Sequence, residues 1–325
     1  MISRRLFIGA GAAALAGADA ALAQSGYPDH TMRLIVGYPA GGGVDIVARL
    51  VSDPMREVLG QPVIVENRAG AAAMIAAQAV AKAGNDGHTL LMAASGEVTI
   101  NKHLYKEKMT YQPETELVPI ALAGIVPCVV VVADASPVRT PAELIAFART
   151  NRGKLSYSSS GVGNPQHLAG ELMNKMAGTD VQHVPYRGSA PAVTDVAVGA
   201  VTMSFSSLGA ALPLIQAGKI RAVAVTSRER MPQLPDVAPL GDALPGYELL
   251  NWFAMFAPAS SPQPILARLA EVMPEIMQRP DIKEKLAIQG IVSRSMTDAE
   301  LRAFVRAESD KFAGIIADAN ITLGN

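Results

Sequence analysis

Three loops of small and polar residues contain the side chains best suited to bind an anion. They are residues 36–46 (VGYPAGGGVDI), 156–168 (SYSSSGVGNPQHL) and 184–192 (VPYRGSAPA), and each lies between an apolar run and a helical pattern. Glycine lets the backbone approach a ligand, and the amides that begin a helix carry a partial positive charge. Hydroxyl and amide groups donate further hydrogen bonds to a carboxylate. Because open α/β sheets bind ligands at the carboxyl ends of their strands, these loops together predict an anion-binding pocket.

Each loop also has a purely structural interpretation. In the first loop Asp45 could satisfy the backbone donors of a tight turn, and in the second Asn164 could cap the following helix. In the third, Arg187 could pair with a ligand carboxylate, be solvated, or lie between two lobes. Small polar residues also end two other apolar runs, at Ser95 and Ser206. The residues alone leave these alternatives open.

The motifs of common enzyme and cofactor sites are missing from the sequence. The first loop has neither the Gly-Lys-Ser/Thr of a Walker A loop nor the Gly-x-Gly-x-x-Gly spacing of a dinucleotide site. In the second loop Ser156 stands where the first glycine of a Gly-x-Ser-x-Gly nucleophile elbow should be. The histidines are scattered singly, without the i, i+4 pairing of a helical metal site: His30, His88, His103, His167 and His183. We therefore expect no enzyme, no metal and no nucleotide or redox cofactor.

The elements that must position these loops follow an α/β pattern, in which strand-length apolar runs alternate with helical periodicity and favour mostly parallel sheets. The expected strands are 33–36, 63–66, 89–93, 129–133, 155–157, 182–184, 203–205, 221–225 and 252–256. The expected helices include 46–59, 72–83, 141–150, 167–177 and 190–198. Pro54 lies inside the first helix and predicts a kink or a restart there.

The length of 325 residues is enough for two lobes, each with its own core. Half of the residues are apolar and 18% are charged, which is typical of a compact globular protein. The chain has two places where it could cross between lobes, at residues 123–127 and in the proline-rich segment 231–246. We predict that residues 24–126 and 232–325 form one lobe and that residues 127–231 form the other.

The N-terminal segment has the layout of a signal peptide. Arg4 and Arg5 precede an apolar stretch at residues 6–18, and residues 21–23 read Ala-Leu-Ala. The stretch is too short to span a membrane, which takes about 20 apolar residues. We predict a twin-arginine-like signal over residues 1–23, with the general secretory route as the alternative, and cleavage after Ala23.

Charge and cysteine content narrow the partners further. A net charge of −1 indicates neither a nucleic-acid surface nor a polybasic membrane patch. Cys128 is the single cysteine, so the chain can form no internal disulfide and no thiolate metal cluster. It lies within the apolar run 126–132, which predicts a packing role in a buried strand.

Several motifs, taken in order, resemble the Bug family, the substrate-binding proteins of tripartite tricarboxylate transporters. They cover essentially the whole chain after residue 23 and lie at residues 33–45, 60–70, 86–91, 167–171, 183–192 and 234–237. The resemblance implies a two-lobed periplasmic-binding-protein fold of type II. In this fold each lobe is a mostly parallel sheet flanked by helices, and hinge closure traps the ligand in a cleft between the lobes.

The resemblance also implies which residues bind the ligand carboxylate. Carried over position by position, they are Tyr38, Ala40, Gly42, Asp45, Ser95, Ser160, Asn164, His167, Arg187, Ser189 and Ser206. Asn164 stands where many relatives have Thr, and Ser206 where many have Asp. An acidic residue at the second position would favour a ligand amine. Ser206 therefore predicts a ligand without a cationic amine, such as a dicarboxylate, a hydroxy acid or an aromatic acid.

The function implied by the resemblance is capture of a small organic carboxylate in the periplasm and its delivery to the membrane permease of a tripartite tricarboxylate transporter. We expect a monomer that binds no nucleic acid. One alternative is a periplasmic sensory adaptor that presents the ligand to a receptor. Another is a periplasmic hydrolase with Ser160 and His167 as nucleophile and base, which must lie within hydrogen-bond reach.

Overall fold

The computed structural model describes residues 26–323, so the predicted signal peptide and its cleavage site lie outside the described residues. The strands are β1 Met32–Val36, β2 Val63–Asn67, β3 Thr89–Ala94, β4 Leu117–Ala133, β5 Leu155–Ser159, β6 Val181–Pro185, β7 Met203–Ser207, β8 Ile220–Val225 and β9 Leu250–Pro258. The α-helices are α2 Gly43–Leu59, α3 Met74–Ala81, α4 Asn101–Leu104, α5 Pro113–Glu116, α6 Pro141–Thr150, α7 Pro165–Ala177, α8 Ser189–Ala197, α9 Leu208–Gln216, α10 Gln263–Gln278, α11 Pro280–Ile288 and α12 Asp298–Asp318. Short helical turns are η1 Ala71–Ala73, η2 Gly96–Ile100, η3 Lys106–Lys108 and η4 Leu240–Asp242. No helix between residues 26 and 323 has the length and apolar character needed to cross a membrane.

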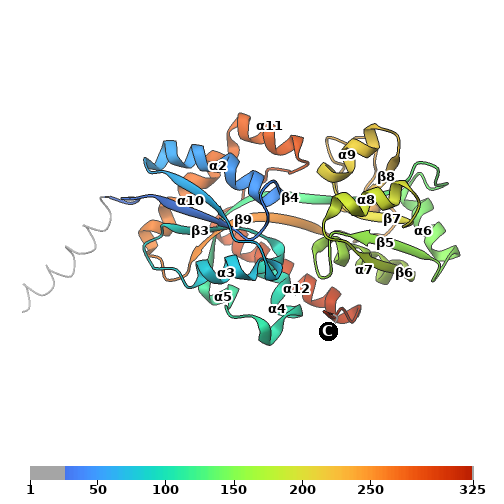
Figure 1. Cartoon of the computed structure of the whole chain (residues 1–325), viewed down its shortest axis with the longest axis horizontal. Helices are drawn as coiled ribbons and strands as arrows, with labels where there is room; N and C mark the ends of the chain where they lie inside the picture. The colour runs from blue at the N-terminus through green and yellow to red at the C-terminus, as the bar shows by residue number, and fades with distance from the viewer. Residues whose placement is uncertain (1–25, 324–325) are drawn as a thin grey trace, which may run out of the picture.

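Nine strands are joined in the order β2-β1-β3-β9-β4-β7-β5-β6, and β8 also pairs with β4. The long strand β4 changes partners along its length: it pairs with β9 as far as Pro127, and with β7 and β8 from Cys128 or Val129 onward. Figure 1 shows the result, two bodies side by side that β4 and the chain leading into β9 connect. We call the body with β1, β2, β3 and β9 the first lobe, and the body with β5, β6, β7 and β8 the second lobe.

Each predicted strand coincides with an observed strand, because the apolar runs are buried in the sheets. The mixed α/β fold is thus confirmed, but the sheets contain more antiparallel pairing than predicted. β1 pairs in parallel with β2 and β3, and β5 with β6 and β7. The pairs β3–β9, β4–β9, β4–β7 and β4–β8 are antiparallel. The difference arises at β4 and β9, the strands through which the chain passes between the lobes.

The predicted restart at Pro54 is wrong, because α2 continues as one helix from Gly43 to Leu59 with Pro54 inside it. Proline removes one helical hydrogen bond, but Val51 and Met55 on either side of it are fully buried in the core of the first lobe. Burial of these side chains outweighs the lost hydrogen bond, since most helix stability in proteins comes from tertiary packing.

Each lobe has a hydrophobic cluster on both faces of its sheet, because successive strand residues point to opposite faces. In β1, Leu34 packs in the cluster with α2 and α10, whereas Ile35 packs in the cluster with α3. In β4, Val130 joins the cluster with α6 and α7, and Val129 joins the cluster with α8 and α9. Helices therefore cover both faces of each sheet (Figure 1).

Two C-terminal segments contact the second lobe. Leu244, Tyr247 and Leu249 lie in the same core cluster as residues of β5 and α7. Helix α12 packs Leu301 against the first lobe and Phe312 against the second, so this one helix bridges both cores. The predicted lobe boundaries at residues 126/127 and 231/232 remain a prediction; residues 232–249 and the end of α12 have their packing contacts largely in the second lobe.

Candidate ligand-binding site

In the first loop, the buried carboxylate of Asp45 organises the backbone. It accepts hydrogen bonds from the amide of Gly41 at 2.9 Å and from Nδ2 of Asn67 at 2.8 Å, and it pairs with Arg49 at 3.0 Å. Burial is the largest single influence on the pKa of Asp45 and raises it, but the hydrogen bonds from Arg49, Gly41 and Asn67 and the charge of Arg49 together outweigh burial and lower the pKa. Asp45 therefore shapes the loop, while Ala40 is exposed beside it.

A second contact joins this loop to the end of β3. The hydroxyl of Tyr38 donates a 2.7 Å hydrogen bond to Oε2 of Glu97, and the amide of Ala94 donates to Oε1 at 2.9 Å. Glu97 is fully buried, and this burial raises its pKa to about 7. A Cβ built on Gly96 would lie 3.6 Å from the Tyr38 hydroxyl, so the two loops are in contact.

Ser95 is also fully buried at the end of β3, and its hydroxyl donates to Oδ1 of Asn251 on β9 at 2.9 Å. Asn251 Oδ1 also accepts from the amide of Trp252. Ser95 is thus held by the neighbouring strand. The structure brings Tyr38 and Ser95 to the same edge of the first-lobe sheet, beyond the carboxyl ends of the parallel strands β1 and β3.

In the second lobe, the loops after β5 and β6 form one polar network. Asn164 caps α7 by accepting from the amide of His167 at 3.0 Å, and its Nδ2 donates to Ser160 Oγ at 2.7 Å. Oε1 of Gln166 accepts a 2.9 Å hydrogen bond from the amide of Ser160, and Nε2 of Gln166 donates to Ser189 Oγ at 3.1 Å. The network positions Ser160 and Ser189 next to each other, with Asn164 acting as the helix cap.

The histidine of the second loop, His167, is held by contacts within the second lobe. His167 Nδ1 accepts from the amide of Gly163 at 3.0 Å, and its ring stacks on His183 with centroids 3.8 Å apart. Burial lowers the pKa of His167 to about 4 and that of His183 to about 3. Among the described residues Ser160 bonds Asn164 and not His167, so the arrangement gives no support to the hydrolase alternative.

The two remaining predicted residues of this lobe, Arg187 and Ser206, differ in burial. Arg187 is exposed, and none of the described acidic residues forms an ion pair with it. Ser206 is fully buried in β7, paired with Val129 of β4, and its hydroxyl bonds the carbonyl of Ser207 at 3.2 Å. The structure links Ser160, Asn164, His167 and Ser189 by hydrogen bonds, but it places Ser206 in the sheet outside that network.

Two helices that begin at these loops lack a side-chain cap. Gly42 precedes α2 and Gly188 precedes α8, and at neither position does a side chain accept a hydrogen bond from the first turn. The amides of a helix start have no partner within the helix and favour an anion. Each lobe therefore offers an uncapped helix start at its predicted ligand loops, and the second lobe has another at α9, where the side chain of Ser207 makes no cap.

A packing contact connects the two lobes close to these loops. Gly163 is buried with φ +75°, and a Cβ built on it would lie 2.3 Å from Cδ1 of Leu104. Leu104 ends α4, which follows the Ser95 loop of the first lobe, and it packs on the second-lobe core. The loop after β5 is therefore seated against the segment that follows β3.

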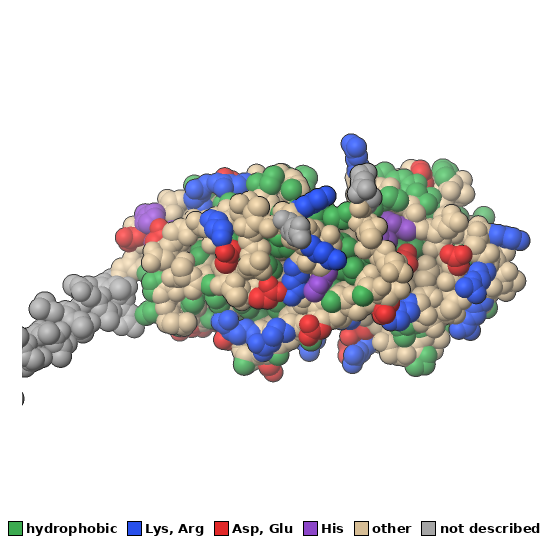
Figure 2. All heavy atoms as spheres, turned by 90° about the horizontal axis from the view of Figure 1, so that it is seen from below, with side chains coloured by type: hydrophobic (Ala, Val, Ile, Leu, Met, Phe, Trp, Pro, Cys, Tyr) green, Lys and Arg blue, Asp and Glu red, His purple; other side chains and the backbone are tan. Residues whose placement is uncertain are grey.

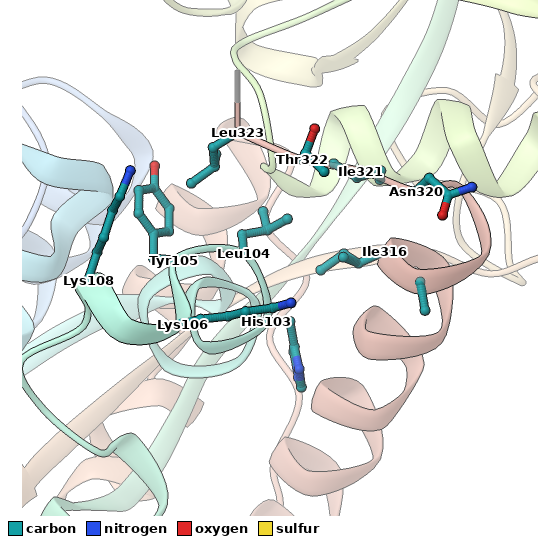
Figure 3. Close-up of a pocket in the computed structure, with 11 residues that line it drawn as sticks. His103, Leu104, Tyr105, Lys106, Lys108, Ile316, Asn320, Ile321, Thr322 and Leu323 are labelled. Carbon is teal, nitrogen blue, oxygen red and sulfur yellow. The ribbon is translucent and has the colours of Figure 1, made fainter. Parts of the chain in front are cut away.

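A separate cavity of about 370 Å³ lies between α4, η3 and the end of α12. Figure 3 shows that Lys106, Lys108 and His103 line it from one side and Asn320 and Thr322 from the other. None of the residues predicted to bind the carboxylate lines this cavity. It is distinct from the site that the loops define.

The chain is similar in sequence and in fold to several known proteins. A family described as tripartite tricarboxylate transporter family receptor (TctC) matches residues 47–321. The protein BugT of Bordetella pertussis is 32% identical over 313 residues, covering 95% of this chain and 95% of BugT. The structure of R. palustris Rpa4515 with adipate has a TM-score of 0.81 and 33% identity and covers 91% of this chain and 99% of its own. MatC (Rpa3494) from Rhodopseudomonas palustris with bound malate has a TM-score of 0.76 and 28% identity, over 89% of this chain and 100% of its own.

The fold is that of a periplasmic binding protein, with loops at the strand ends of two lobes. This chain belongs to the TctC family of tripartite tricarboxylate transporter receptors, to which the Bug proteins also belong. The resemblance to the Bug family is confirmed, and the family is one of solute receptors and not of enzymes.

Sequence reasoning missed four residues that hold the site together. They are Asn67, Glu97, Gln166 and Asn251, each of which hydrogen-bonds a predicted site residue or its loop. Glu97 and Gln166 lie within two residues of predicted positions, so an acidic or amide side chain beside a loop was an available signal. Asn67 and Asn251 come from distant strands, and only the sheet pairing brings them near.

Proposed function

We propose that this receptor binds a small dicarboxylate between its two lobes and delivers it to the permease of a tripartite tricarboxylate transporter. The observation that carries the proposal is the pair of uncapped helix starts, α2 in the first lobe and α8 in the second. A dicarboxylate has one anionic group for each. Relatives with bound adipate and bound malate support this ligand class, because both ligands have two carboxylates.

The charges near the loops agree with an anionic ligand. Asp45 is neutralised by Arg49, and Glu97 is buried with a pKa near 7. Arg187 is exposed and next to Gly188, the residue that precedes α8. We assign Arg187 to the second carboxylate, with Ser160, Asn164 and Ser189 as hydrogen-bonding groups. Ser206 has no charge, so this part of the site offers no partner to a ligand amine.

The remaining parts of the proposal concern the whole protein. We propose export by a twin-arginine-like signal over residues 1–23, cleavage after Ala23, and a monomer in the periplasm. Closure of the two lobes would occur about β4 and the chain leading into β9, since these segments join the sheets.

The test is a thermal-shift screen of the mature protein, followed by calorimetry. A ligand that binds only the folded state raises the melting temperature as its concentration exceeds Kd. We expect malate, adipate or a similar dicarboxylate to stabilise the protein, with weaker effects of matched monocarboxylates. No shift with any dicarboxylate, or tighter binding of glutamate or aspartate, would contradict the proposal.

A matched pair of variants tests the assignment of Arg187. Arg187→Gln should weaken dicarboxylate binding about tenfold or more, because a charge-assisted hydrogen bond contributes roughly 1.5–3 kcal/mol. Arg152→Gln is the control, since Arg152 is also exposed but precedes β5 at the opposite edge of the same sheet. Equal affinity in both variants would remove Arg187 from the site.

A further inference from the structure

Far from the ligand loops, three metal-binding side chains meet at the surface of the first lobe. Asp29, His30 and His88 each place a ligand atom so that all of these atoms lie within 4.8 Å of one another. Asp29 and His30 precede β1 and His88 precedes β3, so the cluster lies at the amino ends of these parallel strands, opposite the loops that follow them. At the left end of Figure 2, histidine lies beside acidic side chains on the surface.

The hydrogen bonds of His88 prepare one ring nitrogen to bind a cation. Its Nδ1 lies 2.9 Å from the carbonyl oxygen of Asp86, which can only accept, so Nδ1 carries the proton. Nε2 then has a free lone pair, and it is buried without a hydrogen-bond partner among the described residues. A histidine that donates from one nitrogen to a backbone carbonyl and presents the other is the usual arrangement of a metal ligand.

The atom nearest to this lone pair is itself an acceptor. Oδ1 of Asp29 lies 3.1 Å from His88 Nε2 and 2.6 Å from Nδ1 of His30. An imidazole lone pair and a carboxylate oxygen at this separation repel each other unless a proton or a metal cation lies between them. The contact therefore marks a place where positive charge is favoured, and the test below distinguishes a proton from a metal ion.

The rings are held in position by aromatic contacts. His30 stacks on His88 with ring centroids 3.6 Å apart and an interplanar angle of 11°. Tyr27 contacts His88 edge-on at 5.2 Å, and its hydroxyl donates to the carbonyl of Gly87 at 2.8 Å. The segment before β1 is thereby fixed against the loop before β3, which keeps Asp29 and His30 beside His88. Two rings stacked face to face cannot both direct an in-plane lone pair at one ion, so the exposed ring of His30 has to turn out of the stack, and out of its hydrogen bond with Asp29, to become a ligand.

We propose that Asp29, His30 and His88 form a binding site for a divalent transition-metal ion of the Zn²⁺ type, with water as the remaining ligand. Two imidazole nitrogens and one carboxylate oxygen suit Zn²⁺, whereas Mg²⁺ and Ca²⁺ prefer sites made of oxygen alone. The side chains of Asp29 and His30 are 72% and 58% exposed, so an ion can enter from solvent. The ion stabilises the start of the folded chain and lies away from the carboxylate loops.

The test uses the mature chain, without an affinity tag, titrated with Zn²⁺ in calorimetry and native mass spectrometry. We expect one ion per chain and a rise in melting temperature with Zn²⁺ but not with Mg²⁺. Asp29→Asn and His30→Ala should each weaken Zn²⁺ binding about tenfold or more. Because both side chains are exposed, the metal-free variants should melt close to the wild type.

Asp53→Asn is the matched control, because Asp53 is 78% exposed on α2 of the same lobe. It should bind Zn²⁺ as the wild type does. Substitution with Co²⁺ adds a spectroscopic readout, since a tetrahedral nitrogen and oxygen site gives visible absorption bands that the two ligand variants should lose. Absence of saturable Zn²⁺ binding would overturn the proposal; the contact between His88 and Asp29 would then be an ion pair between a protonated imidazole and a carboxylate. Unchanged Zn²⁺ binding in Asp29→Asn and His30→Ala would also overturn it and place the ion elsewhere, for instance at His167 and His183.

Discussion

The hydroxyl of Tyr38 donates a 2.7 Å hydrogen bond to the fully buried carboxylate of Glu97. This contact joins the glycine-rich loop after β1 to the loop after β3, and burial raises the pKa of Glu97 to about 7. The other ionisable groups facing Glu97 are the phenols of Tyr38 and Tyr111, whose own pKa values burial raises, so both are neutral. Glu97 is therefore the group at this end of the site that changes charge near neutral pH.

Ligand binding should be coupled to protonation of Glu97. A ligand carboxylate at the start of α2 would raise the pKa of Glu97 further, because like charges disfavour ionisation. We expect proton uptake on binding above about pH 7, and affinity that falls severalfold between about pH 6 and pH 8. Calorimetry in two buffers with different ionisation enthalpies measures the uptake. Glu97→Gln should abolish it, and buffer-independent enthalpies in the wild type would contradict the coupling.

Acid should destabilise the protein through the stacked pair His167 and His183. Burial lowers both pKa values, to about 4 and about 3, so between about pH 4 and 6.5 the unfolded chain binds more protons than the folded one. Stability from these histidines is complete above about pH 6.5 and is lost as the pH falls, by roughly 2–4 kcal/mol. Glu97 has the opposite sign: because burial raises its pKa in the folded state, the stability that it contributes falls as the pH rises from about 4.5 to 7, where the unfolded chain has lost this proton and the folded chain still holds it.

Urea unfolding as a function of pH separates these contributions. His183→Phe keeps an aromatic ring against His167 but removes one titrating group, so its stability should fall less steeply in acid than that of the wild type. Glu97→Gln should instead remove the loss of stability on the approach to neutral pH. If the free energy of unfolding falls equally steeply in acid for His183→Phe and for the wild type, the pair His167 and His183 does not cause the loss of stability in acid.

Removal of the Asp45 carboxylate should disorder the first loop. Asp45→Ala leaves the amide of Gly41 and one N–H of the Asn67 side chain without an acceptor, at a cost of roughly 2–3 kcal/mol; the other N–H still donates to the carbonyl of Tyr38. Asp53→Ala, on the exposed side of the same helix, should change the free energy of unfolding by less than about 0.5 kcal/mol. Chemical denaturation measures both. We also expect Asp45→Ala to weaken ligand binding, because the loop backbone loses its anchor.

The contact between the lobes can be tested at Gly163. Gly163 and Gly178 both have positive φ, +75° and +64°, so alanine is strained at either, by about 1 kcal/mol. Only at Gly163 would the new Cβ collide with Leu104; at Gly178 no atom lies within 4 Å. Gly163→Ala should therefore destabilise the protein more than Gly178→Ala, by about 1–3 kcal/mol.

The double variant Gly163→Ala/Leu104→Ala distinguishes a collision from backbone strain. If the collision dominates, truncation of Leu104 opens space for the new methyl group. The double variant should then be destabilised by less than the sum of the costs of the two single variants. Strict additivity in the double-mutant cycle would mean that the lobes do not meet at this contact.

The strand pattern shows how far local sequence determines structure. Every predicted strand is present, because a run such as residues 129–132 is buried on both faces of its sheet and its apolar composition predicts this directly. Local sequence could not predict which strands pair with one another or in which direction. The antiparallel pairing of β4 and β9, and the continuation of α2 through Pro54, depend on contacts with residues far along the chain.

For the site, the sequence by itself determined which loops are polar, which helices follow them and which family the motifs resemble, since these are properties of short segments. Only the tertiary structure decided what each side chain does. Asp45 and Asn164 are engaged in the loop and the helix cap, Glu97 is buried behind Tyr38, and His30 reaches His88. The reason is physical: hydrogen bonds, pKa shifts and metal ligation depend on separations of a few ångströms, and parallel strands bring together residues that are distant in the chain.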